Sequence, residues 1–176
     1  MKKLFFFTLL IFLSSCSPKI IPEKTISYYS VDVQKLELKN KNSVNLMSVD
    51  GIDYLLTKKI AYRENYKWGY FQKGEWICSP DCMLTKNLLK NLPYLSENSD
   101  NKLYIKILDF YVDFQPDIAY SVASFQVSLK KEKDEYSKVF NYKVKTKNSI
   151  EDIVKGFDEA LQYFIKDLDS WLSEKL

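Results

Sequence analysis

Three cysteines carry most of the chemistry that the sequence could support. The first, Cys16, follows two lysines, an apolar run from Leu4 to Leu13 and two serines. The run is too short to cross a bilayer of about 30 Å and is typical of a removable export signal. Leu13-Ser14-Ser15-Cys16 resembles the lipobox, in which the cysteine thiol is acylated and becomes the mature N-terminus. We predict a lipoprotein signal peptide over residues 1–15 and lipidation of Cys16; an ordinary secretory signal cleaved near Ser15 is the alternative.

A lipid anchor on Cys16 would place the rest of the chain outside the cytoplasm. The expected diacylglyceryl group and N-acyl chain bury many CH₂ groups, which hold a protein to a membrane more firmly than a single chain does. Ser17 stands where an aspartate would favour retention in the inner membrane under enterobacterial-type sorting rules. We therefore expect a periplasm-facing lipoprotein, with the outer membrane favoured over the inner.

The other two thiols, Cys78 and Cys82, lie in the segment Cys-Ser-Pro-Asp-Cys at the start of a predicted helix. Both would meet an oxidising compartment, and the turn into a helix can bring them close together, so we predict a disulfide that fixes this turn. A redox-active pair is the alternative, although the spacing differs from the Cys-x-x-Cys of thioredoxin-like enzymes.

Other chemistry has little support in this composition. The chain contains no histidine, which excludes histidine-based triads and His-containing zinc sites. Its four glycines are scattered, so there is no glycine-rich phosphate loop. Asp109, Asp113 and Asp117 could form an acid/base pair, but their spacing is typical of solvated aspartates beside a turn. We predict no enzyme activity, no catalytic residues, no metal and no cofactor.

Length and charge indicate a single domain without a nucleic-acid partner. The formal net charge of +3 includes Lys2 and Lys3 of the signal, which leaves +1 on residues 16–176. Pro18 and Pro22 disfavour helix and central strand, so residues 16–25 are predicted to form a lipidated tether. Residues 26–176 then form one domain.

An aromatic segment from Ile60 to Phe71 is the strongest candidate for a contact surface. It alternates with period two, which predicts one strand, or two strands that meet near Asn65. In this pattern Ile60, Tyr62, Tyr66, Trp68 and Tyr70 share one face, and Arg63, Asn65 and Lys67 share the other. Such a face is usually sheet core; a platform for lipid or a partner is the alternative. The candidate contacts are Arg63, Trp68, Tyr70 and Phe71. Arg63 could serve an interface, act as a hydrogen-bond clamp or be a simple exposed arginine.

The remaining patterns predict an α+β fold, with a mainly antiparallel sheet packed with two helices. Strands are expected over residues 26–38, from 44 through 56, and in a three-stranded meander over 103–114, 118–129 and 136–145. Helices are expected over 80–92, with Ser79 as the cap, and over 149–173, with Asn148 and Glu151 as a capping box. The first two meander strands both change their apolar phase, which predicts a bulged hairpin in which both strands switch faces.

Several short motifs resemble a known family when they are taken in order. They are the lipobox, Tyr28-Tyr29-Ser30-Val31, Ile60-Ala61-Tyr62-Arg63, Gly74-Glu75-Trp76 with Pro80 and the leucines of the first predicted helix, Ile107-Leu108-Asp109-Phe110 and a terminal amphipathic helix. This succession resembles the ABC-type transport auxiliary lipoprotein family. The resemblance implies a non-catalytic accessory lipoprotein of an MCE-type ABC transporter, which moves lipids between the inner and outer membranes. The implied partners are an MCE-domain protein with its ABC permease and ATPase, and a homo-oligomer is possible.

Two other functions remain open at this stage. An outer-membrane assembly lipoprotein of the lipopolysaccharide or β-barrel machinery would share the anchor and the α+β pattern. A free-standing surface lipoprotein would share them as well.

Overall fold

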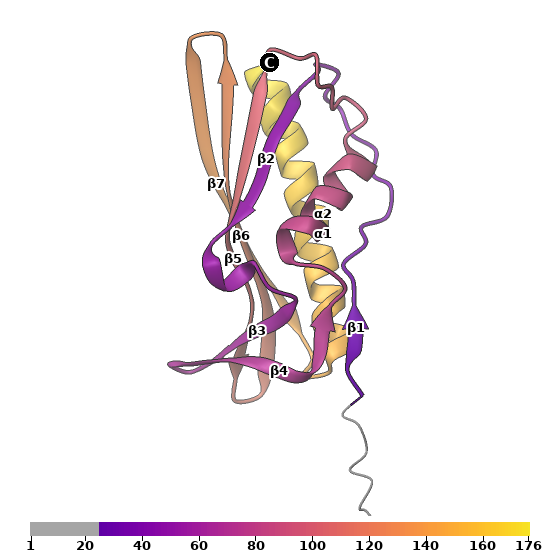
Figure 1. Cartoon of the computed structure of the whole chain (residues 1–176), viewed down its shortest axis with the longest axis vertical. Coiled ribbons are helices and arrows are strands. Elements are labelled where there is room, and N and C mark those ends of the chain that lie inside the picture. The colour runs from indigo at the N-terminus through magenta and orange to yellow at the C-terminus, as the bar shows by residue number, and fades with distance from the viewer. Residues whose placement is uncertain (1–24) are drawn as a thin grey trace, which may run out of the picture.

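The computed structural model describes residues 25–176, so the predicted signal, Cys16 and nearly all of the tether lie outside the described residues. Within residues 25–176 the chain forms one seven-stranded sheet and two α-helices, an α+β architecture in two layers (Figure 1). The strands are β1 (Ser27–Tyr29), β2 (Asn45–Gly51), β3 (Lys59–Glu64), β4 (Lys67–Trp76), β5 (Lys102–Gln115), β6 (Ile118–Lys131) and β7 (Asp134–Thr146). The helices are α1 (Pro80–Asn91), α2 (Ile150–Lys175) and a 3₁₀ turn, η1 (Asp53–Leu55).

The sheet is mixed, and β5 is its organising strand. The main path is β1-β4-β3-β5-β6-β7, and β2 pairs with β5 beside this path. The predicted meander is present as the antiparallel strands β5, β6 and β7, whereas β1–β4, β2–β5 and β3–β5 are parallel pairs. The sheet is therefore less uniformly antiparallel than the sequence suggested.

The predicted change of face occurs in β5 but not in β6. The register of β5 against β6 shifts between Ile107 and Asp109. The β5 residues that face the core are therefore odd-numbered up to Ile107 and even-numbered from Phe110 onward. In β6 the odd-numbered residues from Ala119 to Leu129 stay buried throughout, which corrects the expectation that both strands switch faces. The apolar residues Tyr120 and Val122, which suggested a second switch, lie on the opposite face from these buried positions.

The long helix α2 covers β6 and β7 with the predicted apolar stripe. Phe164 stacks on Phe125 with ring centroids 4.1 Å apart, and Phe157 stacks on Phe110 at 4.3 Å. The helix begins one residue later than the predicted capping box implied. Ser149 is the N-cap residue, and its hydroxyl accepts a hydrogen bond from the Asp152 amide at 3.1 Å.

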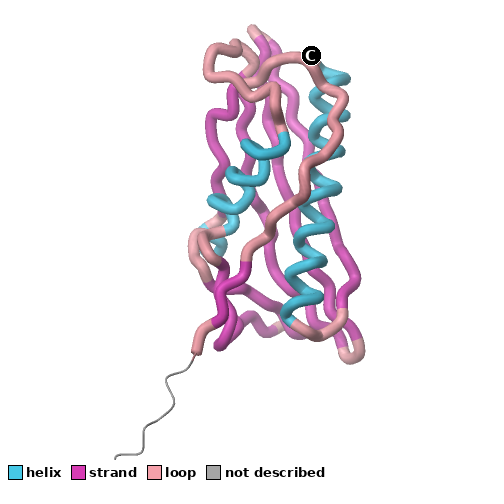
Figure 2. The backbone as a smooth tube through the Cα atoms, turned by 90° about the vertical axis from the view of Figure 1, so that its right-hand side faces the viewer, coloured by secondary structure: helices cyan, strands magenta, loops and turns pink. Residues whose placement is uncertain are grey.

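The predicted first strand over residues 26–38 is wrong beyond Tyr29. Residues 30–43, here called the belt, leave the sheet and run between the two helices (Figure 2). The buried amide of Asn87 accepts from the Val33 backbone and donates to the Val31 carbonyl. The Asp169 carboxylate accepts from the Lys39 and Asn40 amides. Side chains of the helices therefore satisfy backbone groups that a strand would have paired in a ladder.

Candidate functional site: an aromatic cup beside an arginine–aspartate pair

The β3–β4 hairpin creates the most distinctive surface of the described residues. Asn65 adopts a positive φ of 54° and, with Tyr66, forms the turn between the strands. Across the hairpin Ala61 pairs with Tyr70 and Arg63 with Trp68, so these four residues share one face. The turn therefore brings two large aromatic side chains over the small buried Ala61.

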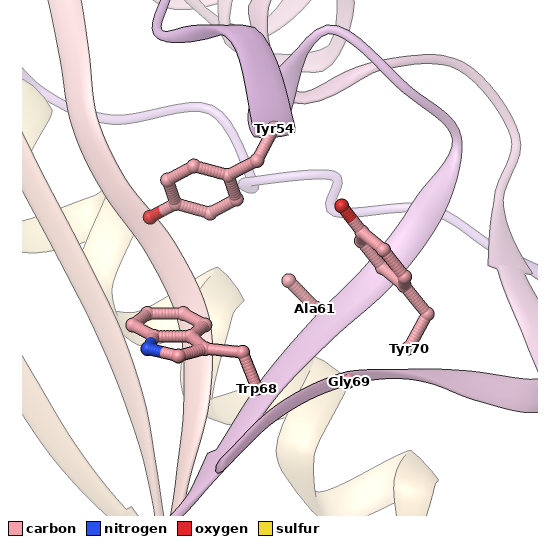
Figure 3. A pocket seen from close by; sticks show the side chains of 5 residues that line it. All are labelled: Tyr54, Ala61, Trp68, Gly69 and Tyr70. Carbon is pink, nitrogen blue, oxygen red and sulfur yellow. The ribbon is translucent and has the colours of Figure 1, made fainter. Parts of the chain in front are cut away.

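The hairpin and η1 together form a cavity of about 330 Å³. We call this cavity the aromatic cup, and it is lined by Tyr54, Ala61, Trp68, Gly69 and Tyr70. Figure 3 shows Ala61 between the three rings, with Tyr54 reaching in from η1. Tyr54 and Trp68 meet edge to face at 5.6 Å between ring centroids. Trp68 and Tyr70 are both exposed on the outer side of the cup. The cup is thus an open apolar hollow with aromatic walls.

A buried carboxylate fixes the arginine at the edge of the cup. Nε and Nη2 of Arg63 lie 3.1 and 3.0 Å from Oδ1 of Asp113, and Nζ of Lys143 lies 3.0 Å from Oδ2. Burial alone would raise the pKa of Asp113, but the hydrogen bonds from Lys143 and Arg63 outweigh it and hold that pKa below its usual value. Asp113 is thereby held as a carboxylate with both oxygens engaged.

The guanidinium of Arg63 also packs on aromatic rings. Its central carbon lies 5.1 Å from the ring centroid of Tyr111 and 5.9 Å from that of Trp68. Trp68 itself packs on Tyr111 with centroids 4.7 Å apart. Arg63 therefore packs against Trp68 in the wall of the cup and also neutralises the charge of Asp113.

The Tyr54 hydroxyl makes a second polar contact below the cup. It donates to Oδ1 of Asp109 at 3.4 Å. Burial and then the neighbouring Asp109 raise the pKa of Tyr54 well above its usual range, so the hydroxyl stays a protonated donor. This hydrogen bond orients the ring that closes the cup on the η1 side.

The structure brings together three of the four residues that the sequence singled out. Arg63, Trp68 and Tyr70 line one face, but Phe71 points to the other side of the sheet. There its ring contacts Tyr62 at 5.5 Å and Phe114 at 6.0 Å. The prediction that Tyr62, Trp68 and Tyr70 share a face is also wrong, because the turn at Asn65 and Tyr66 shifts the alternation between the strands.

Sequence reasoning did not find Tyr54, Tyr111 or Lys143 as parts of this site. It weighed Asp113 only as one of several aspartates beside a turn. Tyr54 sits in a short 3₁₀ turn, and Asp113 lies 50 residues after Arg63. The signal in the sequence was that Arg63 is the lone arginine of the chain, and this does not identify its partner.

The thiols Cys78 and Cys82 form a disulfide at the start of α1, with their Cα atoms 6.0 Å apart. Ser79 occupies the N-cap position without a side-chain capping hydrogen bond, and Pro80 is the first helical residue. The crosslink therefore supports the turn into α1 where the side-chain cap is absent.

Residues 25–176 contain neither a candidate metal site nor a helix that could span a membrane. No group of three or more potential metal ligands gathers there. In the same part of the chain, neither α-helix combines the length and the hydropathy that a membrane crossing requires.

The fold defined by this sheet and its two helices occurs in solved structures. A protein of Xanthomonas campestris described as DUF330 matches with a TM-score of 0.72 at 15% identity, over 82% of this chain and 94% of that one. A second crystal structure, of an uncharacterized protein, matches with a TM-score of 0.68 at 16% identity, over 86% of this chain and 98% of that one. At these identities the likeness shows the fold alone.

A comparison of sequences gives a relative in Aquifex aeolicus, described as an uncharacterized protein. It is 29% identical over 122 residues, which are 68% of this chain and 65% of the relative. The match thus spans less than two thirds of that relative's length. No family model matches the chain.

These findings correct the assignment to the ABC-type transport auxiliary lipoprotein family. The structures that share the fold are described as DUF330 and as uncharacterized, and neither description names a transport auxiliary protein. The motifs that suggested the family are short and degenerate, and their order follows the order of elements in the fold.

Proposed function

We propose that this chain is a non-catalytic accessory lipoprotein of the cell envelope, anchored through Cys16, that docks on a protein partner through the aromatic cup and Arg63. The observation that carries the proposal is an open apolar cup next to a charge cluster whose groups are already paired. The periplasm-facing location follows from the predicted lipobox.

The composition of the cup suits a protein partner. Tryptophan, tyrosine and arginine are the residues most enriched at the energetic centres of protein interfaces. Trp68, Tyr70 and Arg63 supply all three types on one face of a hairpin. The hollow over Ala61 has room for an apolar side chain of the partner.

The charged groups of the site favour positioning over catalysis. Asp113 is engaged by Arg63 and Lys143, and the Tyr54 hydroxyl is engaged by Asp109. A general acid or base needs a group that can exchange a proton near neutral pH. The hydrogen bonds to Asp113 instead hold its pKa below the usual value, and burial together with Asp109 raises the pKa of Tyr54. The polar groups therefore hold the aromatic walls in place.

As the partner we propose a component of an assembly that transports lipids between the inner and outer membranes, such as an MCE-domain protein with its permease and ATPase. The predicted anchor supports a place in the envelope. The following experiment identifies the partner.

A photoreactive phenylalanine at position 70 of the full-length lipoprotein tests the docking surface in intact cells. The matched control carries the same group at Tyr163 on α2, because Tyr70 and Tyr163 are 40% and 45% exposed. We expect an envelope protein to be crosslinked from position 70 and not from position 163. Equal yields from both positions would overturn the docking surface.

The identity of the captured protein then decides between the functions. An MCE-domain protein recovered with an ATPase supports the transport function. A β-barrel protein would instead favour an outer-membrane assembly lipoprotein, and protease access on intact cells would favour a surface lipoprotein.

A further inference from the structure

We propose that the tip of the β3–β4 hairpin, centred on Tyr66, is a second contact with the membrane that carries the anchor. This inference rests on the predicted acylation of Cys16 within the proposed function, but not on the protein partner. It assigns a role to an aromatic residue that neither the core nor the aromatic cup uses.

Tyr66 is the most exposed large apolar residue of residues 25–176. Its exposed fraction is 99%, so nothing in this part of the chain covers the ring. It stands at the turn of a hairpin that projects from the body of the sheet (Figure 1). Tyrosine and tryptophan concentrate at membrane surfaces, where the ring meets the acyl region and the polar atom stays among the headgroups.

The hairpin tip lies at the end of the molecule that the tether enters. β1 begins at Ser27, and this point and the tip of β3–β4 both lie at the lower end of the long axis in Figure 1. The C-terminus and the turn between β6 and β7 lie at the opposite end. The start of β1 and the hairpin tip thus lie at the same end of the long axis, where the hairpin projects sideways from the sheet (Figure 1).

The length of the tether keeps this end close to the bilayer. The eleven residue steps from Cys16 to Ser27 reach at most about 40 Å when fully extended. The tether therefore keeps the start of β1 within about 40 Å of the bilayer, and the hairpin tip lies at that same end of the domain. When the tether is not extended, this end of the domain comes close to the headgroups, and the tip can contact them.

Charge at the tip neither attracts nor repels a lipid surface. Glu64 and Lys67 lie directly opposite each other across the hairpin on either side of the turn. Because these charges compensate, the contact depends on the aromatic ring and does not require anionic lipids. This distinguishes it from attachment through a basic patch, which requires an anionic surface.

The test uses the full-length acylated protein in phosphatidylcholine vesicles, with no partner protein present. Trp76 and Trp171 are buried, so replacing Trp68 with Phe removes the exposed tryptophan of the described residues. In this background Tyr66→Trp places a fluorescent reporter at the tip, and Tyr163→Trp is the control on α2. Both reporter positions are exposed, so neither change threatens the fold.

We expect vesicles with brominated acyl chains to lower the emission of the Tyr66→Trp reporter by about twofold relative to unbrominated vesicles. Emission from the Tyr163→Trp control should not change. Equal emission from the tip reporter in both kinds of vesicle, with the protein floating with the lipid, would overturn the membrane contact. Failure to float would overturn the anchor itself, whereas failure of the docking surface would appear only in the crosslinking experiment.

Discussion

Arg63 and Asp113 lie opposite each other on the parallel strands β3 and β5, and Nε and Nη2 of the arginine both contact the same carboxylate oxygen. Asp113 is only 5% exposed, so its charge depends on its partners. The pair joins the hairpin that carries the aromatic cup to the central strand of the sheet. The orientation of the cup is therefore coupled to a buried ion pair.

Arg63→Ala should destabilise the domain while leaving it folded. The variant leaves the nearly buried Asp113 carboxylate with Lys143 as its remaining partner in the contact network described above. We expect a loss of about 1–3 kcal/mol in the free energy of unfolding, measured by urea denaturation. Lys90→Ala is the control, because it breaks an exposed ion pair with Asp32 and should cost only about 0–1 kcal/mol. Equal losses in the two variants would contradict the importance of burial.

The stability of the domain should fall at acid pH partly through Asp113. Its pKa in the fold is held below the usual 3.8, so the unfolded chain binds this proton first as the pH falls. The resulting stabilisation is complete above about pH 4 and is lost as the pH falls through the lowered pKa. We expect the difference in unfolding free energy between the wild type and Asp113→Asn to shrink below pH 4. A difference that stays constant from pH 7 to pH 3 would contradict this linkage.

Removing the disulfide should have a modest effect. The loop closed by Cys78 and Cys82 is short, so the Cys78→Ser, Cys82→Ser variant should lose no more than about 2 kcal/mol of unfolding free energy. Wild-type protein treated with a reductant should match the variant in urea denaturation. A redox role would instead appear as a loss of partner capture in the variant without any change in stability.

Asn87→Ala should release the belt from α1. The side chain of Asn87 is fully buried and serves the backbone of both Val31 and Val33. We expect a loss of about 2–4 kcal/mol in unfolding free energy and faster hydrogen exchange at the Val33 amide. Asn45→Ala is the control, because its side chain bonds the Glu97 carbonyl at an exposed position. Unchanged exchange at Val33 would show that the belt is held by its apolar contacts alone.

The elements with a clear periodicity were predictable from the sequence. Strands β5, β6 and β7 and the helix α2 lie within a few residues of their predicted bounds, because alternation and the 3.6-residue stripe reflect burial directly. The belt was predicted as a strand because Val31 and Val33 are β-branched and apolar. Both are buried, but between helices, and their backbone partners come from Asn87 more than 50 residues away. Local propensity cannot identify such distant partners.

The site was predictable in composition but not in geometry. Trp68 and Tyr70 were found as large aromatic residues of an alternating segment, and Arg63 was found as a charged residue of the same segment. The turn at Asn65 and Tyr66 then decided which of them share a face, and it placed Phe71 on the other side of the sheet. A turn of two residues resets the phase of every residue after it, so a period-two pattern cannot be extended across it.

The parallel pairing of β1 with β4 also determines how the domain would bear mechanical force. If Cys16 is fixed in a membrane, any drag on the domain pulls on the start of β1, along the strand axis. The hydrogen bonds between Ser27–Tyr29 and Gly74–Trp76 are then loaded together in shear and are not peeled apart one by one. Beyond β1 the load passes to the belt, where Asn87 and Asp169 distribute it to the two helices. This short strand is thus the mechanical junction between the lipid anchor and the folded domain.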